Sequence, residues 1–266
     1  MLTTTSLFSS QYVRLPLPPL GIDKPSLQRT LLTTPSSQTF SSIAQTYDED
    51  LYRPEKILGI PKLRKRLLSQ IKSGSVLEVS CGTGINLNHY PFVKKSSSSV
   101  KSTPSSSPPG LSHLILTDAS DSMLDVAISK FESSTELKEL LQVNDTRLGW
   151  RKEIGESLSF PSESFDYVVD TFGLCSHEDP LLVLKEMSRV LKPNGKLLLL
   201  EHGKSNQFPW LTTILNRTAL SHAQRWGCWW NRDIVRLVIE ADLKVESLEM
   251  NHFGTTYTIV ASKPTL

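Results

Sequence analysis

The chain has 266 residues, of which 29 are basic and 27 acidic, so its formal net charge is +2. This length can bury the core of one large domain with or without extensions. The near balance of charge gives no argument for a nucleic-acid partner. No stretch approaches the roughly 18 apolar residues that span a bilayer. The three cysteines, Cys81, Cys175 and Cys228, are distant in sequence and odd in number, which argues against a disulfide framework or a zinc site and fits a reducing compartment.

Residues 1–42 differ in composition from the rest of the chain. They are rich in serine and threonine, carry Arg14, Lys24 and Arg29, and contain one acid, Asp23. An acid-poor, hydroxyl-rich and arginine-bearing start is typical of an organelle transit peptide, and we interpret it as a mitochondrial one. The prolines at 16, 18 and 19 rule out one long helix, so a disordered tail without an address is the alternative.

The folded domain is expected over 43–266, beginning with helices at 43–49 and 63–71. In the second helix an apolar stripe of leucine and isoleucine predicts the buried face. Lys62 and Arg64–Arg66 cover the other faces. Basic runs of this kind are mostly solvated helix faces, and contact with acidic lipid or a partner is the alternative interpretation.

Val76–Val79 reads as a short strand that breaks into a Gly82-Thr83-Gly84 turn before a helix-compatible segment. A strand, a glycine turn and a helix in this order are how open α/β sheets hold an adenosine-containing cofactor. The pattern lacks the third glycine of a dinucleotide site and the Gly-Lys-Ser/Thr of a P-loop. Glu78, placed before the turn, suits a cationic or hydroxyl-rich ligand.

Residues 94–110 are low in complexity, with serine runs and three prolines, and predict a disordered surface insertion. A buried-type strand at 114–118 follows and ends in Asp118. Without the insertion, the gap from Gly84 approaches the spacing of roughly 20 at which a second-strand carboxylate reaches ribose hydroxyls. Ser120 or Asp121 would cap the next helix.

The second half of the chain continues the alternation of strands and helices. A strand at 164–171 leads into a loop that ends at His177, and Pro180 begins a helix that stops before Gly195. A strand at 196–200 ends in Glu201-His202. The segment 208–230 holds four of the five tryptophans together with His222. Two further strands at 245–249 and 255–261 predict a closing hairpin.

Three strings resemble the class I S-adenosylmethionine-dependent methyltransferases. They are Glu-x-x-x-Gly-x-Gly from Glu78, Asp-x-Ser-x-x-Met-Leu from Asp118, and the long run from Phe165 through Glu-Met-x-Arg-Val-Leu-Lys-Pro. The last is similar to the methyltransferase type 11 group, and more narrowly to mitochondrial methyltransferase-like proteins named as yeast oxidase-assembly suppressors and their thiol-methylating animal relatives. The resemblance implies a Rossmann-like α/β fold: a seven-stranded, mostly parallel sheet, helices on both faces and an antiparallel closing hairpin.

The same resemblance implies S-adenosylmethionine as the cofactor and a set of residues that bind it. In two places the chain departs from the family pattern, because Ser80 replaces the usual first glycine and Ile154 replaces the acid expected at the adenine amine. Backbone groups near Gly155 would then serve the adenine. The implied cofactor-binding residues are Glu78, Ser80, Cys81, Gly82, Gly84, Asp118, Ala119, Met123, Gly155, Glu156 and Thr171.

A sulfonium methyl is already activated, so positioning supplies most of the catalysis of a methyl transfer. A general base is needed only for an acceptor that arrives protonated, and His202, His222 and His177 are the candidates. The tryptophan-rich segment suits a small or lipid-like apolar acceptor, or peripheral contact with a membrane, and core packing is the alternative. We therefore expect a mitochondrial methyltransferase acting on a small or apolar acceptor. A non-catalytic assembly factor for the respiratory chain that keeps the fold is the competing class. A nicotinamide-dependent oxidoreductase lacks its motifs here.

Overall fold

The structure, a computed structural model, describes residues 35–92 and 110–264. The predicted tail and insertion therefore lie outside the described residues, apart from positions 35–42 and Gly110. The helices are α1 (Pro35–Ile43), α2 (Tyr47–Leu58), α3 (Ile60–Leu68), the short 3-10 helix η1 (Ile85–His89), α4 (Asp121–Ser133), α5 (Thr135–Val143), α6 (Pro180–Val190), α7 (Pro209–Trp226) and α8 (Ile234–Glu240). The strands are β1 (Gly74–Val79), β2 (Leu111–Asp118), β3 (Arg147–Lys152), β4 (Phe165–Thr171), β5 (Leu191–His202), β6 (Lys244–Asn251) and β7 (Thr256–Ser262).

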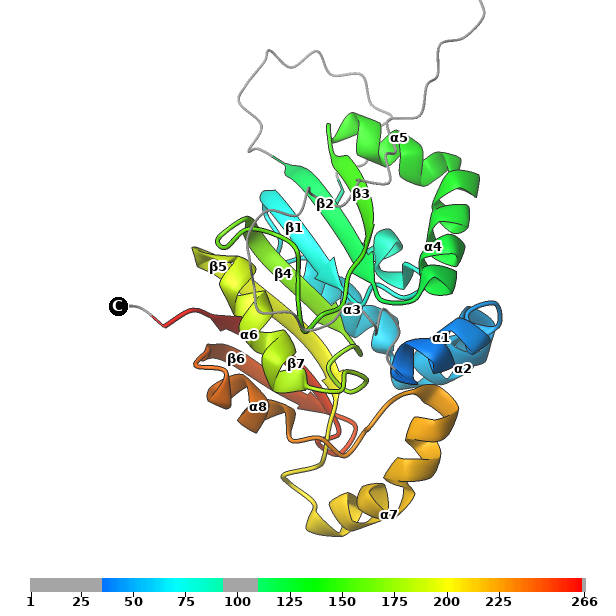
Figure 1. Cartoon of the computed structure of the whole chain (residues 1–266), viewed down its shortest axis with the longest axis vertical. Coiled ribbons are helices and arrows are strands. Elements are labelled where there is room, and N and C mark those ends of the chain that lie inside the picture. Colours follow the sequence, from blue (N-terminus) through cyan, green and yellow to red (C-terminus); the bar gives the residue numbers. More distant parts are fainter. Residues whose placement is uncertain (1–34, 93–109, 265–266) are drawn as a thin grey trace, which may run out of the picture.

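The seven strands form one sheet in the order β3-β2-β1-β4-β5-β7-β6 (Figure 1). Strands β1 to β5 pair in parallel, while β7 runs antiparallel to both β5 and β6. The strand order changes direction between β1 and β4, and in doubly wound sheets the crevice at the carboxyl ends of such strands binds ligands. The expected mostly parallel sheet and its antiparallel closing hairpin are confirmed.

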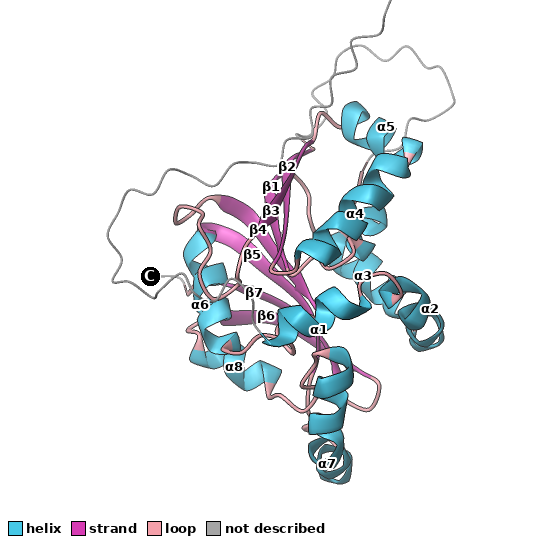
Figure 2. Ribbon diagram, turned by 45° about the vertical axis from the view of Figure 1, so that its right-hand side comes forward, coloured by secondary structure: helices cyan, strands magenta, loops and turns pink. Residues whose placement is uncertain are grey.

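Both faces of the sheet are covered by helices, with α3, α4 and α5 on one face and α6 and α8 on the other (Figure 2). The reason is the alternation of side chains along each strand. Val76 and Leu198 enter the core beneath α3 to α5. Leu77 and Leu199, one residue further along each strand, enter the core beneath α6 and α8. A parallel sheet buried in this way needs apolar residues on both faces of its central strands.

Three helices, and not the two that the sequence predicts, precede β1. The predicted helix at 43–49 is wrong, since α1 ends at Ile43 and α2 begins at Tyr47. Gly59, with a φ of 69°, separates α2 from α3. Helix α1 begins at Pro35, inside the segment that the sequence assigns to the tail. A tertiary contact accounts for this difference, because the Phe40 ring packs against Gly227 at the end of α7.

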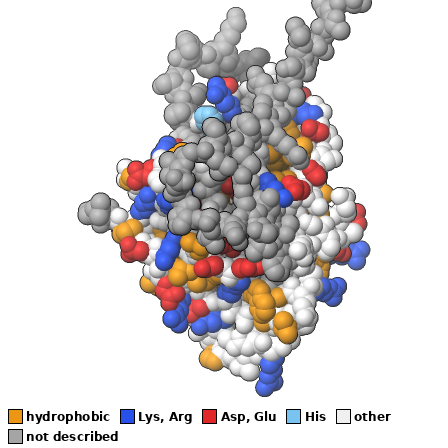
Figure 3. All heavy atoms as spheres, viewed as in Figure 1, with side chains coloured by type: hydrophobic (Ala, Val, Ile, Leu, Met, Phe, Trp, Pro, Cys, Tyr) orange, Lys and Arg blue, Asp and Glu red, His pale blue; other side chains and the backbone are white. Residues whose placement is uncertain are grey.

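Helix α7 is the longest of the described helices and projects away from the sheet (Figure 1). Trp210 on this helix is 59% exposed, so it is not the core residue of the alternative interpretation. Among the described residues, every helix is too short or too polar to cross a membrane. The visible surface mixes side chains of both charges with apolar ones (Figure 3), in agreement with the small net charge.

Candidate functional site

A pocket lies at the carboxyl ends of β1, β2 and β4, where the strand order reverses. Its floor is the glycine turn after β1, and its walls are the end of β2 and the loops after β3 and β4. Helices α1 and α2 cover it through residues 36, 37, 40 and 47. The pocket brings together nine of the residues predicted from sequence, namely Ser80, Cys81, Gly82, Asp118, Ala119, Met123, Glu156, Thr171 and His177.

In the turn after β1, Ser80 adopts the backbone conformation that is typical of the glycine it replaces. Ser80, which stands at that place, has a φ of 56°, in the left-handed region that side chains rarely adopt. Gly82 has a φ of 55°, and a Cβ built there would meet nothing within 4 Å. Gly84 does not line the pocket. Its lack of a Cβ instead lets Leu87 and Ala127 pack closely against its backbone. The open backbone at Gly82 is the part of the turn that a ligand can approach.

Asp118 joins the end of β2 to the glycine turn. Its Oδ2 accepts a hydrogen bond from the Gly82 N–H at 2.9 Å, and its Oδ1 accepts one from the Ser120 N–H at 2.8 Å. Burial raises the pKa of this carboxyl, and those two donors act against the shift. Ser120, one of the two caps that the sequence offers, caps α4, and Met123 of α4 reaches the pocket. Each Asp118 oxygen keeps a lone pair for a further donor.

Glu78 lies behind the pocket and not on its wall. Its side chain is buried and accepts hydrogen bonds from Asn86 Nδ2 at 2.8 Å and from the Tyr90 hydroxyl at 2.6 Å. Burial raises the pKa of Glu78 to about 7, although both hydrogen bonds act in the opposite direction. The structure therefore gives Glu78 the position of a support for Asn86, which does line the pocket.

Arg64 is a charged pocket side chain that the sequence interpretation missed. Its place in a basic run predicts a solvated helix face, but Arg64 is 4% exposed and lines the pocket. One guanidinium nitrogen donates to Asn86 Oδ1 at 3.1 Å and to Thr171 Oγ1 at 2.7 Å, and the other donates to Glu55 at 2.7 Å. The prediction was wrong because α3 turns this position toward the sheet. The only sequence signal is its spacing of three from Leu67, one of the apolar residues of the same helix.

His177 is the one predicted histidine that reaches the pocket. Its Nε2 lies 2.9 Å from the Ser80 hydroxyl, and its Nδ1 lies 3.5 Å from Glu156 Oε1. Burial lowers the pKa of His177, but the Glu156 hydrogen bond and the charges of Asp170 and Asp118 outweigh it, so the pKa is raised. Gly155 leaves the space that the imidazole fills, since a Cβ there would lie 2.7 Å from the ring. Gly155 thus shapes the site from outside the pocket.

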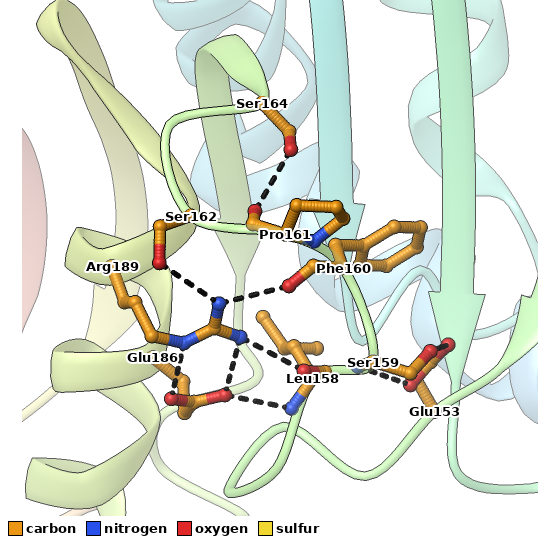
Figure 4. A network of polar contacts seen from close by, with 9 residues as sticks. All are labelled: Glu153, Leu158, Ser159, Phe160, Pro161, Ser162, Ser164, Glu186 and Arg189. Carbon is orange, nitrogen blue, oxygen red and sulfur yellow. Dashed lines mark hydrogen bonds and ion pairs between the residues drawn. The ribbon is translucent and has the colours of Figure 1, made fainter. Parts of the chain in front are cut away.

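The loop after β3 is held by hydrogen bonds from Glu186 and Arg189, the two charged residues of the Glu-Met-x-Arg string (Figure 4). Arg189 of α6 donates to the carbonyl oxygens of Leu158 and Phe160, both at 2.8 Å, and pairs with Glu186. Glu186 also accepts from the Leu158 N–H at 2.9 Å. These contacts tie the loop to α6 and so fix Ile154 and Glu156, which line the pocket.

The other two predicted histidines lie outside the pocket. The ring of His202 packs on that of Phe172, with centroids 4.5 Å apart. His222 stacks on Trp230 at 3.7 Å, and burial, together with the charges of His202 and Arg225, lowers its pKa to about 4. No residue of α7 lines the pocket among the described residues. Helices α1 and α2, and not the tryptophan-rich segment, contribute lining residues to the pocket.

Two of the three cysteines, distant in sequence, are close together in the fold. The sulfurs of Cys175 and Cys228 and a ring nitrogen of His202 all lie within 4.8 Å of one another. The distance along the sequence, on which the argument against a zinc site rested, therefore does not separate these two cysteines in space. Cys81 stays apart from this group and lines the pocket.

With this geometry in view, the relatives of the chain identify its class. Residues 32–214 match the model of the ubiE/COQ5 methyltransferase family, which is more than half of the chain. The chain belongs to the ubiE/COQ5 methyltransferase family. S-adenosylmethionine is the cofactor that this membership implies, as the sequence motifs predict. The enzyme class expected from the motifs is thus confirmed at the level of the family.

Two curated relatives show how far the likeness extends. The mitochondrial methyltransferase OMS1 of Saccharomyces cerevisiae is 30% identical over 251 residues, which is 91% of this chain and 50% of that protein. The ubiquinone/menaquinone biosynthesis C-methyltransferase UbiE of Hahella chejuensis is 34% identical over 174 residues, 63% of this chain and 59% of the relative. The chain therefore spans about half to three fifths of these relatives' length.

Solved structures agree on the fold. A methyltransferase of Haloferax volcanii, solved in complex with the Trm112 methyltransferase activator, has a TM-score of 0.61 at 15% identity, and the match covers 87% of this chain and 98% of that one. A SAM-dependent methyltransferase of Thermotoga maritima has a TM-score of 0.57 at 15% identity, with 85% and 99% covered. The fold is also that of the [4+2]-cyclase SpnF, with a TM-score of 0.52 at 14% identity, so the fold by itself does not show methyl transfer.

Proposed function

We propose that this chain transfers the methyl group of S-adenosylmethionine to a small, apolar acceptor. The observation that carries this function is the composition of the pocket at the switch point of the sheet. A glycine turn with open backbone, the Asp118 carboxylate and the Arg64 guanidinium all face one space. Together they offer partners for the ribose and for the carboxylate of the cofactor's methionine end.

The ribose, the methionine end and the adenine of the cofactor each have a candidate partner among the pocket residues. Asp118, held by two backbone N–H groups, is placed for the ribose hydroxyls, and Arg64 is placed for the carboxylate of the methionine end, because a guanidinium pairs well with carboxylates. Met123 and Ile154 supply apolar surface for the adenine. Glu156 Oε2 is buried and has no hydrogen-bond partner among the described residues, so it takes the role of the missing acid at the adenine amine.

The chain's contribution to catalysis is to position the acceptor and to keep water out. S-adenosylmethionine supplies an activated methyl group, so an in-line approach by the acceptor is the main requirement. Phe40, Tyr47 and Phe172 give the pocket an aromatic wall beside the polar floor. For an acceptor that carries a proton, His177 is the group able to receive it, because it faces the pocket and the Glu156 carboxylate beside it, which raises the pKa of His177, stabilises the protonated ring.

The chemistry of the wall favours an aromatic or otherwise apolar acceptor. UbiE of Hahella chejuensis is named for a C-methylation in ubiquinone and menaquinone biosynthesis, and a ring of that kind would stack on Phe40 or Phe172. A mitochondrial location rests on the yeast relative and on the composition of residues 1–42. Exposed apolar side chains such as Ile57, which is 85% exposed, support peripheral contact with a membrane.

Calorimetric titration tests the cofactor, and methyl transfer tests the reaction. The purified chain should bind S-adenosylmethionine and its demethylated product, while Asp118→Asn binds both at least tenfold more weakly. Asp145→Asn, which changes an exposed aspartate before β3, is the matched control and should bind as the wild type does. Methyl transfer from labelled cofactor is then measured to a reduced quinone and to an aliphatic thiol of equal size. Binding without transfer to either acceptor would favour the non-catalytic assembly factor over the enzyme.

A further inference from the structure

Three side chains of types that bind metals meet beside the pocket proposed for the cofactor. They come from separate segments: Cys175 from the loop after β4, His202 from the end of β5, and Cys228 from the loop after α7. The Cys228 sulfur lies 3.7 Å from His202 Nδ1, and the three donor atoms all lie within 4.8 Å of one another. None of the three residues lines the pocket.

One pair of donors has nearly the spacing of ligands in a tetrahedral site, and the third donor lies within 4.8 Å of both. With Zn–S near 2.3 Å and Zn–N near 2.0–2.1 Å, a sulfur and a nitrogen ligand of a tetrahedral zinc ion stand about 3.5–3.6 Å apart, and two sulfur ligands about 3.8 Å apart. The distance of 3.7 Å between Cys228 Sγ and His202 Nδ1 is within about 0.2 Å of the sulfur–nitrogen value. Cys175 is 1% and Cys228 7% exposed, so both sulfurs are shielded from bulk solvent. Thiolates and imidazole are the donors that select zinc over magnesium or calcium.

We propose that Cys175, His202 and Cys228 bind one Zn²⁺ ion, with the fourth position left to a small exchangeable ligand. All of the cysteines and histidines of the chain lie within the described residues, and no fourth one joins the cluster there. Two thiolates balance the charge of the ion, so the buried site is neutral overall. The Ser176 hydroxyl, 3.5 Å from the Cys175 sulfur, is able to donate to a thiolate.

The ion would connect the loop after β4, which forms one wall of the pocket, to the end of β5 and to the loop after α7. Cys175 lies in the turn that carries Phe172 and His177, both of which line the pocket. The segment after Cys228 already docks on this turn, since the Trp229 N–H donates to Cys175 O at 2.7 Å and Arg232 donates to Leu174 O at 2.7 Å. A bound metal adds a third connection, through His202 on β5. Removing it should therefore loosen one side of the pocket.

The test begins with the full chain, purified under reducing conditions and assayed for zinc by mass spectrometry. We expect about one zinc per chain, and a loss of about tenfold or more in Cys175→Ser, Cys228→Ser and His202→Asn. Cys81→Ser, which removes the one buried cysteine that lies outside the cluster, is the matched control and should keep its zinc. Zinc retained by all three cluster variants, or absent from the wild type after zinc is added, would overturn the proposal.

A second measurement uses the wild type alone, so it holds even where a variant fails to fold. Cobalt(II) added to the metal-free chain should give one equivalent of a tetrahedral spectrum with thiolate charge-transfer bands. Zinc should also slow alkylation of Cys175 and Cys228 but not that of Cys81. An octahedral cobalt spectrum, or a Cys175–Cys228 disulfide that forms in air whether or not zinc is present, would show that the cluster is not a metal site. The outcome does not depend on methyl transfer.

Discussion

Replacing Glu78 by glutamine tests whether the burial of this carboxyl makes the free energy of unfolding depend on pH. Burial raises the pKa of Glu78 from 4.5 to about 7, whereas in the unfolded chain the carboxyl is exposed to water. Between these two values the folded state holds a proton that the unfolded state has released. The free energy of unfolding therefore falls as the pH rises through this interval and levels off above the folded pKa.

The size of the effect follows from the shift. A difference of about 2.5 pKa units, at about 1.4 kcal/mol per unit, corresponds to about 3 kcal/mol of stability present at low pH and lost by pH 8. Glutamine keeps an oxygen for Asn86 and carries no charge. Relative to the wild type, we expect Glu78→Gln to gain about 3 kcal/mol between pH 4.5 and pH 8.

Urea unfolding of both proteins without cofactor, across this range of pH, measures the difference directly. Buried acids that the Glu78 charge does not perturb contribute to each curve and cancel in the comparison. Asp170, whose pKa the Glu78 charge raises, adds to the difference in the same direction. Glu49→Gln removes an exposed carboxylate in the first turn of α2 and is the control, which should track the wild type. A difference between Glu78→Gln and the wild type that stays constant with pH would refute the desolvation of Glu78 and the position assigned to it.

Three further predictions concern the pocket and its surroundings. Asp118→Ala should weaken S-adenosylmethionine binding by about 1.5–3 kcal/mol in calorimetry, through lost hydrogen bonds, and unchanged affinity would show that Asp118 does not meet the ribose. Phe40→Ala should raise the KM for the acceptor with cofactor affinity kept within about twofold, or about 0.4 kcal/mol, whereas the control Trp210→Ala, on the exposed part of α7, leaves both constants unchanged. If Trp210→Ala is instead the defective variant, the acceptor meets α7. Deleting 96–108 should leave the melting temperature and cofactor affinity nearly as they are, because loop length adds little closure cost, and a large fall in either would mean that the insertion packs on the domain.

The sequence predicted the parts of this protein in which chemistry depends on neighbours along the chain. The glycine turn follows β1 directly, and Asp118 ends the next strand, so both reach the same edge of a parallel sheet. The predicted Ser120 cap and the closing hairpin are local features of the same kind. Five further predicted residues, such as Met123 and Glu156, reach the pocket because they end or follow a strand in this way.

The tertiary structure decided everything that depends on which face of an element meets another. Arg64 stands in a basic run that reads as solvated, and only the packing of α3 against the sheet turns it toward Asn86 and Thr171. Cys175 and Cys228 are distant in sequence, and their meeting at His202 requires the loop after α7 to fold back on the loop after β4. Local pattern carries periodicity and turn chemistry, but it holds no information on contacts between segments that are far apart along the chain. For that reason the motifs identified the class of the protein, and the fold was needed to show which side chains share its pocket.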